Sequence, residues 1–329
     1  MTSLTRTPTC LIVGALVTLL AGCGAPSGNL GTVPPPAQTP AASAGPVVPD
    51  LTPGPDVTPG TSGSPSGPVS PVPSGPVASP AATTIVRAYF VLGGTPGSTG
   101  LVPVLRAVPQ TAAVATAAMN ALLAGPTGDE SGLRTITSAV PTGSRLLRLS
   151  IQNGVATVDL STEFDSGGGS ASMRYRLNQV VYTLTQFQTV TSVLFQIEGR
   201  TVTVFGSEGI VLDGPVGRGA DLDLLPEIFI DRPAYGATIG NPARITGNAN
   251  VFEATFRIGL LDAKGAILAD QPVMATCGTG CRGTFDVTLR YAVSQGQWGT
   301  LRAYNLSARD GSPESVREYP VWLTPANQP

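Results

Sequence analysis

The sequence predicts an α+β domain, with two helices on one face of a mixed sheet, followed by an all-β sandwich. Between residues 83 and 220, two stretches with apolar residues at helical spacing stand among β-rich runs. From residue 221 to 329 the helical spacing disappears, and seven short β-rich stretches recur between turns. Ahead of both, residues 24–82 are mostly Pro, Gly, Ser, Thr, Ala and Val without apolar periodicity, which predicts a disordered segment.

The N-terminus predicts secretion. An apolar run from Leu11 to Leu20 is too short to span a bilayer, so we interpret residues 1–22 as a signal peptide. The stretch Leu20-Ala21-Gly22-Cys23 resembles the lipobox of bacterial lipoproteins. The resemblance implies that Cys23 carries a diacylglycerol thioether, with palmitate-type chains that hold the protein on the outer side of the cell membrane. The alternative is an ordinary signal peptide in which Cys23 is incidental.

The segment from Cys23 to residue 82 is predicted to be a linker. Asp50 and Asp56 are its only charged residues, and nothing in it could bury a core. We expect it to act as a disordered spacer through a layer of the cell envelope.

Composition excludes several classes of function. The formal net charge is -2 and only 12% of residues are charged, so a basic surface for nucleic acid is not expected. The chain has no histidine, which rules out a Ser-His-Asp triad, a Cys-His pair and a His-ligated zinc site. The single lysine, Lys264, lies in a turn sequence and should point into water. We therefore expect no enzyme, cofactor or metal site.

The first domain should begin with two strands and a helix. Thr84 to Val91 and Leu101 to Val108 are β-rich runs separated by a Gly/Pro loop. Residues 111–124 place Ala and Leu side chains on one helical face, and Gly125-Pro126 ends that helix.

Asn153-Gly154 predicts a β-hairpin with a two-residue turn. Pairing Gln152 with Val155 places Arg148 opposite Asp159, so we interpret Asp159 as a cross-strand ion-pair partner. The same register predicts one apolar face, made by Leu147, Leu149, Ile151, Ala156, Val158 and Leu160.

A second helix and hairpin should follow. Residues 172–188 carry a clean apolar stripe, with Ser170 or Ser172 as the expected cap. The opposite side is polar and uncharged, and it could be a solvated face or a contact surface; it holds Gln179, Thr183 and Gln186. A turn at Glu198-Gly199 would place Val193 and Phe195 beside Val204 and Val202.

Several motifs of this region resemble the GerMN domain of sporulation and spore-germination lipoproteins. They are Val102-Pro103-Val104 with Arg106, Ala121 to Pro126, Gly132-Leu133, Pro141 to Leu147, Val158 to Ser161, and Leu177 to Phe187. The resemblance implies an α+β envelope domain without catalytic residues.

The second domain should be a β-sandwich. The seven expected strands are Ile228–Ile230, Ala243–Ile245, Val251–Leu261, Ala266–Ala269, Gly283–Tyr291, Gly299–Ala308 and Ser315–Leu323. Its Asn250 to Ala254, Gly283-Thr284-Phe285 and Ala308 to Ser312 motifs resemble the immunoglobulin-like domain that accompanies GerMN in spore-germination proteins. Glu253 lies among apolar strand residues, and we expect a structural hydrogen bond or ion pair for it.

Two further groups of residues could carry chemistry. Cys277 and Cys281 are too few for a zinc site and have the wrong spacing for a thioredoxin-like motif, so we expect a disulfide, with a reversible switch as the alternative. Asp213, Asp221 and Asp223 could in principle bind calcium, but their spacing fits no calcium loop and favours a solvated linker.

These features together predict a non-catalytic, lipid-anchored protein of the cell envelope that binds or scaffolds protein partners. The resemblance implies a sporulation-, germination- or wall-associated complex. The alternative is a module that binds a cell-wall polysaccharide or muropeptide, with Trp298, Tyr291 and Tyr304 stacking on sugars. An exposed aromatic groove would favour the alternative, and an apolar patch would favour protein assembly.

Overall fold

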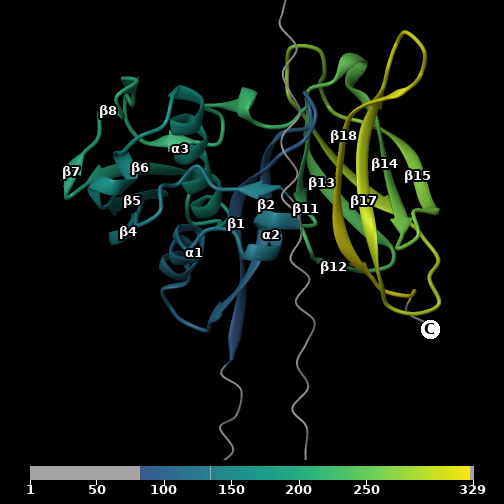
Figure 1. Ribbon diagram of the computed structural model, residues 1–329, viewed down its shortest axis with the longest axis horizontal. Coiled ribbons are helices and arrows are strands. Elements are labelled where there is room, and N and C mark those ends of the chain that lie inside the picture. Colours follow the sequence, from purple (N-terminus) through teal and green to yellow (C-terminus); the bar gives the residue numbers. More distant parts are fainter. Residues whose placement is uncertain (1–81, 134, 327–329) are drawn as a thin grey trace, which may run out of the picture. The chain divides into compact units, whose positions relative to one another are not determined.

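Figure 1 shows the computed structural model, which describes residues 82–133 and 135–326. The predicted signal peptide, the lipobox-like stretch with Cys23 and the predicted linker up to residue 81 lie outside the described residues. The limits expected for the two domains, at residues 83 and 221, stay predictions.

The first domain alternates strands and helices, as the sequence predicts. Its elements are β1 (Thr83–Leu92), β2 (Gly100–Pro109), α1 (Val114–Leu123), α2 (Gly128–Leu133), β3 (Ile136–Thr137), β4 (Leu146–Gln152), β5 (Val155–Leu160), α3 (Ser170–Leu184), β6 (Ser192–Ile197), β7 (Arg200–Thr201), β8 (Val204–Phe205), β9 (Ile210–Val211) and β10 (Val216–Gly217). One sheet has the order β2-β1-β3 and another the order β10-β6-β5-β4. The predicted α+β fold class is confirmed, with the short helix α2 as an addition.

Helix α3 lies at the centre of this domain and contacts both β1 and β6. Ten of its fifteen residues are buried, so it has no broad solvated face. It begins one residue after Gly169, and no side chain caps it, so the cap expected from Ser170 or Ser172 is wrong. The turn before the helix contains Gly167 and Gly168, which both adopt a positive φ that glycine accepts without strain.

The polar side of α3 pairs with the backbone of β1. The Arg87 N–H donates to Oε1 of Gln186 over 2.9 Å, and Nε2 of Gln186 donates back to the Arg87 carbonyl over 2.6 Å. Two residues further along β1, the Tyr89 N–H donates to Oγ1 of Thr183, and Nε2 of Gln179 donates to the Tyr89 carbonyl. Strand β3 pairs with β1 only at Val91 and Leu92, so the backbone groups of β1 before these residues have no strand partner on that side among the described residues. The polar side chains supply their hydrogen bonds instead.

The Asn153-Gly154 hairpin has the predicted register from Gln152, opposite Val155, to Arg148, opposite Asp159. Beyond Arg148 the register shifts, and Leu146 lies opposite Leu160, so the predicted position of Leu147 in the ladder is wrong. Both turn residues have positive φ, as a primed turn requires. The apolar face is buried only on β5, because β4 is the last strand of its sheet. Leu147 remains 45% exposed and Ile151 37% exposed, so these two apolar side chains of β4 are open to solvent.

The expected ion pair of Asp159 is also wrong. No ion pair joins Arg148 to Asp159 within residues 82–326, and the Asp159 carboxylate instead accepts a 2.8 Å hydrogen bond from the backbone N–H of Gly199. That contact fixes the turn at Glu198-Gly199, which lies where the sequence predicts it. Asp159 thus stabilises a neighbouring turn.

The strand after that turn pairs for a shorter length than expected. Val202 bonds to Phe195 as predicted, but the chain then leaves the sheet and forms the β8–β9 hairpin. Val193 pairs with Val216 of β10, so the expected pairing of Val193 with Val204 is wrong.

The second domain is a two-sheet sandwich that contains all seven predicted strands. They are β11 (Ile228–Arg232), β13 (Ala243–Ala249), β14 (Thr255–Asp262), β15 (Ile267–Met274), β16 (Gly283–Leu289), β17 (Gln297–Leu306) and β18 (Pro313–Leu323), with the short β12 (Thr238–Ile239) as an addition. One sheet has the order β11-β13-β16 and the other the order β12-β18-β17-β14-β15. Figure 1 shows these strands, without any α-helix, in the green to yellow part of the chain. The prediction of an all-β sandwich is confirmed.

One predicted strand begins late. Residues Phe252–Ala254 form a 3₁₀ turn, in which Glu253 has a φ of 53°. Phe252 is exposed, and the core alternation starts at Phe256. The side chain of Glu253 is exposed and forms no ion pair in the described part of the chain, so the bond expected for its carboxylate is wrong. Its backbone bonds instead: the N–H donates to Oγ1 of Thr279, and the carbonyl accepts from the hydroxyl of Thr255.

Candidate functional site

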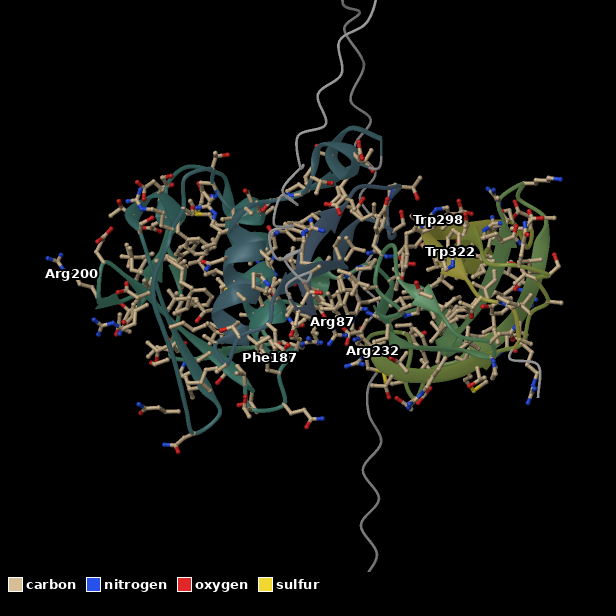
Figure 2. The ribbon with its side chains drawn as sticks, turned by 90° about the horizontal axis from the view of Figure 1, so that it is seen from below. Arg87, Phe187, Arg200, Arg232, Trp298 and Trp322 are labelled. Atoms are coloured by element: carbon tan, nitrogen blue, oxygen red, sulfur yellow. A yellow bond between two sulfur atoms is a disulfide. The ribbon has the colours of Figure 1, made fainter. Side chains whose placement is uncertain are left out.

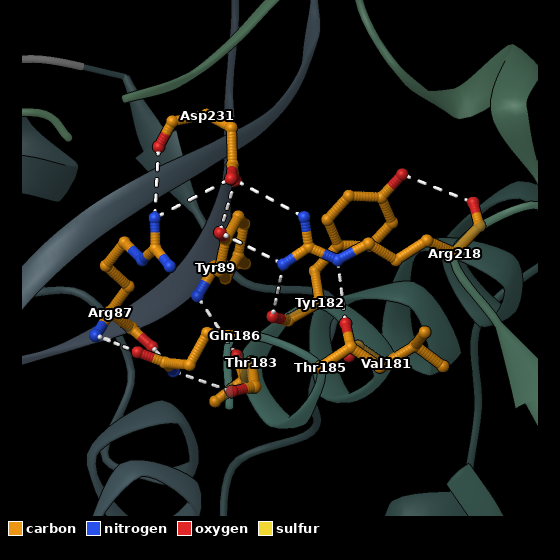
Figure 3. Close-up of polar contacts among 9 residues, drawn as sticks. All are labelled: Arg87, Tyr89, Val181, Tyr182, Thr183, Thr185, Gln186, Arg218 and Asp231. Carbon is orange, nitrogen blue, oxygen red and sulfur yellow. Dashed lines mark hydrogen bonds and ion pairs between the residues drawn. The ribbon is translucent and has the colours of Figure 1, made fainter. Parts of the chain in front are cut away.

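A partly buried polar network joins the two domains around Asp231 of β11 (Figure 3). The hydroxyl of Tyr89 donates a 2.5 Å hydrogen bond to Oδ1 of Asp231. The guanidinium groups of Arg87 and Arg218 approach the same carboxylate at 3.6 Å and 3.4 Å. Arg218 also lies over the ring of Tyr182, with 4.5 Å between the guanidinium carbon and the ring centroid.

The surroundings keep the Tyr89 phenol protonated. Burial, together with the negative charge of Asp231, raises the pKa of Tyr89 well above its ordinary value. A phenol that holds its proton can donate to Asp231 at any physiological pH. The network is therefore suited to fixing one domain against the other.

Arg317 of β18 makes a second connection between the domains. It is only 2% exposed, and it donates over 2.7 Å to the carbonyl of Ser98, in the loop that leads into β2, and over 2.6 Å to the carbonyl of Leu101, at the start of β2. Burial lowers the pKa of Arg317 to about 10. Because a buried guanidinium is costly without partners, these carbonyls stabilise it and order the loop.

Glycines allow the same loop to approach the second domain. A Cβ on Gly100 would lie 2.5 Å from Cδ of Pro226 and 2.6 Å from its backbone nitrogen. The Glu227 N–H also donates to the carbonyl of Gly97 over 2.7 Å. These contacts leave no space for side chains at this part of the junction.

The acidic group near the junction is engaged by arginine. Asp221 and Asp223 both form ion pairs with Arg174 of α3, and Asn178 donates to Asp221 as well. The interpretation as solvated residues is therefore wrong for Asp221, whose side chain is 18% exposed, whereas Asp223 remains 66% exposed. Asp213 does not join them in the ion pairs of the described residues. Within residues 82–133 and 135–326 there is no cluster of three or more His, Cys, Asp or Glu that could hold a metal ion.

Cys277 and Cys281 lie together in the loop before β16, with 5.9 Å between their Cα atoms and their sulfur atoms at bonding distance. The loop packs on the 3₁₀ turn of residues 252–254, since the Thr279 N–H donates to the Val251 carbonyl. The disulfide itself stays a proposal. Lys264 is exposed in its turn, as predicted, and the carboxylate of Asp262 accepts the backbone N–H groups of Lys264 and Ala266.

The three aromatic residues considered for sugar stacking differ in exposure. Tyr291 is buried and donates to the Ile239 carbonyl, and Tyr304 is buried and donates to Asp270. Trp298 is 51% exposed, and its ring meets Trp322 edge to face. Figure 2 labels the two residues, which are neighbours in the second domain. Only Trp298 can present an aromatic face to a ligand.

Trp298 lines a cleft of about 710 Å³ between α2 of the first domain and β17 and the β14–β15 turn of the second. Its lining consists of Thr127, Asp129, Glu130, Tyr235, Gly236, Asp262, Ala263, Gly265, Trp298, Gly299, Thr300 and Pro320. The sequence prediction did not include Asp129 or Tyr235, because nothing in the sequence brings α2 beside the turn after β14.

A second surface lies on the first domain, along β4. Leu149 and Ile151 of β4 line a groove of about 320 Å³ with Phe187 and the start of α1. In the described part of the chain, no strand pairs with the outer edge of β4. We refer to this edge, with Leu147, Leu149 and Ile151, as the β4 surface.

The described residues contain no helix that is long and apolar enough to cross a membrane. Fold and junction define a class of protein in which an α+β domain and a β-sandwich are joined by a buried polar interface. Residues 87–203 match the Germane family, described as "Sporulation and spore germination", and residues 227–312 match the Gmad2 family, described as "Immunoglobulin-like domain of bacterial spore germination". The chain thus combines a GerMN domain with the immunoglobulin-like domain of spore-germination proteins.

Solved structures with similarity to this chain include two from the sporulation protein GerM of Bacillus subtilis. The first GerMN domain is 19% identical, with a TM-score of 0.35, over 42% of this chain and 99% of that one. The tandem GerMN domains are 14% identical, with a TM-score of 0.36, over 64% of this chain and 62% of that one. Among curated protein sequences, none matches this chain. Neither family description names an enzyme.

Proposed function

We propose that this protein is a non-catalytic, lipid-anchored component of the cell envelope, and that its GerMN domain binds a protein partner through the β4 surface. The family descriptions support a role in sporulation or germination. The lipobox at Cys23 supports an anchor on the extracytoplasmic side of the membrane. The single observation that carries the partner-binding proposal is the unpaired, apolar edge of β4.

An open strand edge is uncommon when it is apolar. Native proteins usually protect such edges with charged residues, proline or a covering element, because unpaired N–H and C=O groups recruit other strands. The strand Leu146–Gln152 carries Arg148 as its only charge, and it has no proline. On β1, by contrast, the edge is satisfied by Thr183 of α3 and by Gln186, two residues after the end of that helix. The difference supports a binding role for β4.

The groove beside β4 supplies pockets for an added strand. Strand addition obtains affinity from main-chain hydrogen bonds and specificity from pockets that receive alternate side chains. The groove next to Leu149 and Ile151 is lined by alanines of α1 and by Phe187, so it suits small apolar side chains. The partner that fits is an extended, apolar segment of another envelope protein.

Site-specific photo-crosslinking in the native membrane tests this proposal. A photo-crosslinking amino acid at Ile151 should give discrete protein adducts, whereas the same residue at Val211, an exposed apolar position on β9, should give none. Adding Leu147→Lys to the Ile151 probe should abolish the adducts, because a charge on this edge blocks strand addition. Identical adducts from both positions, or turnover of a cell-wall or peptide substrate by the purified chain, would overturn the proposal.

A further inference from the structure

The cleft beside Trp298 is not needed to explain either domain's fold. It lies between helix α2 and the second domain, and it has the volume of a small-molecule site. Both family matches exclude part of its lining, since Tyr235, Asp262 and Trp298 come from one domain and Asp129 from the other. The cleft therefore exists only where the two domains occur together.

Its apolar wall is preorganised. Trp298 pairs with Trp322 across the β17–β18 ladder, and the two ring centroids are 5.4 Å apart at an interplanar angle of 84°. Edge-to-face packing of this kind holds an aromatic ring in place. Trp298 nevertheless leaves 51% of its surface in solvent, beside Pro320 and Tyr235 in the same cleft. It forms a fixed, flat, apolar platform.

The polar wall consists of hydrogen-bond acceptors whose positions are also fixed. Glu130 is held by Arg106 over 2.6 Å, and it closes a capping box with Thr127 at the start of α2. Asp262 accepts two backbone N–H groups through Oδ1, which leaves Oδ2 available. Asp129 forms no ion pair with any described residue.

The charges define the class of ligand. Three carboxylates line the cleft, and no Lys or Arg is among the residues that line it, so an anionic ligand would be repelled. The charge of Glu130 is compensated by Arg106, and Asp262 accepts hydrogen bonds from backbone N–H groups. These two carboxylates therefore do not require a cationic ligand. A ligand with a flat apolar face and several hydroxyl donors fits both walls.

We propose that this cleft binds an uncharged saccharide. One pyranose ring stacks its C–H face on Trp298, and its hydroxyl groups donate to Asp129 and Asp262. This goes beyond the protein-partner function, because it uses another surface and another class of ligand. The two tyrosines first considered for stacking, Tyr291 and Tyr304, take no part.

The test uses the full chain and two uncharged probes, chitotetraose and cellotetraose, with tetragalacturonate as the anionic comparison and tetralysine as the cationic one. Trp298 and Trp322 are the only tryptophans in the sequence, so their fluorescence reports directly on the cleft. At least one uncharged probe should change the emission saturably and give a matching calorimetric affinity. Tetragalacturonate should do neither.

Trp298→Ala should weaken that affinity at least about tenfold, as truncation of an aromatic anchor does. Phe252→Ala, which removes an exposed aromatic residue outside the cleft, is the matched control and should leave the affinity unchanged. Failure of both uncharged probes, equal binding by the Trp298→Ala variant, or tighter binding of tetragalacturonate or tetralysine would each overturn the proposal.

Discussion

The hydroxyl of Tyr89 and the carboxylate of Asp231 are 2.5 Å apart, although 142 residues separate them along the chain. Tyr89 belongs to β1 of the GerMN domain and Asp231 to β11 of the immunoglobulin-like domain. Their contact lies between Arg87 and Arg218, as Figure 3 shows. The two domains are thus joined by polar groups that are satisfied only when both are folded.

Tyr89→Phe should lower the free energy of unfolding by about 1–3 kcal/mol, because Asp231 loses a buried donor and keeps only two distant arginines. Urea denaturation measures this change. In a double-mutant cycle with Asp231→Asn, the two substitutions should be clearly non-additive. Additivity within about 0.5 kcal/mol would contradict the assigned contact.

Alkaline pH should destabilise the protein through its buried tyrosines. Burial raises the pKa of Tyr182 from its ordinary value of 10.0 to about 12, and it also raises the pKa of Tyr89 and Tyr319. Above pH 10 the unfolded chain releases these protons before the folded chain does. The free energy of unfolding is therefore unaffected below pH 10, and above pH 10 each such tyrosine lowers it by about 1.4 kcal/mol per pH unit. The lowered pKa of Arg317 has the opposite effect, because the folded chain loses that proton at a lower pH than the unfolded chain, and it offsets the contribution of one tyrosine.

Urea denaturation between pH 8 and 11.5 measures that slope. Tyr182→Phe is an informative variant, since its hydroxyl makes only a 3.3 Å contact with the Arg218 carbonyl. It should make the slope shallower by about one proton. Constant stability of the parent protein over this range would contradict the prediction.

Gly100→Ala should destabilise the junction by about 1–3 kcal/mol, because the new methyl group would collide with the backbone of Pro226. Thermal unfolding measures the loss. Gly128→Ala is a matched control: it lies in α2, has no atom within 4 Å of the added Cβ, and should be neutral or slightly stabilising. Equal effects of the two substitutions would show that the close approach at Gly100 is unimportant.

Cys277 and Cys281 should resist thiol labelling in the exported, denatured protein until a reductant is added. Replacement of both by serine should reduce stability by at most about 2 kcal/mol, because the closed loop is short. Mass spectrometry and urea denaturation measure the two effects. Complete labelling without reductant would contradict the proposed disulfide.

Cys23→Ala should move the protein from the membrane fraction to the soluble fraction and abolish incorporation of labelled palmitate, because the proposed lipid anchor is lost. Cys277→Ala provides the control, and it should remain in the membrane fraction. Retention of the Cys23→Ala variant on membranes would refute the anchor.

Local signals predicted much of the fold. Asn153-Gly154 set the register of its hairpin, which is confirmed from Gln152 to Arg148, because a two-residue turn leaves one way to pair the strands. The seven strands of the second domain followed from short β-rich runs between turns. One signal at the junction could have been read from the sequence: Arg317 shares its strand face with Tyr319, Val321 and Leu323, a charge at a core position.

Other features depend on contacts between distant segments. The hairpin register could place Leu147 and Ile151 on a common face, but not show that β4 is an edge strand. Arg148 lies opposite Asp159 as expected, yet the Asp159 carboxylate accepts a hydrogen bond from the N–H of Gly199. Gly199 lies in the turn after β6, and β6 pairs with β5 in parallel, which the hairpin alone could not predict. The cleft at Trp298 needed α2 and the turn after β14 to meet, and no local pattern encodes that.

The contact of Arg317 with Ser98 has a consequence for the order of folding. The two residues are separated by 219 positions, so the carbonyls of the loop before β2 remain without this donor until β18 has emerged. A chain that folds from its N-terminus can form the helices and hairpins of the first domain early, but the contact with Arg317 can form only at the end. The loop before β2, with Ser98, would therefore be open to proteases in any chain whose synthesis stopped short of Arg317.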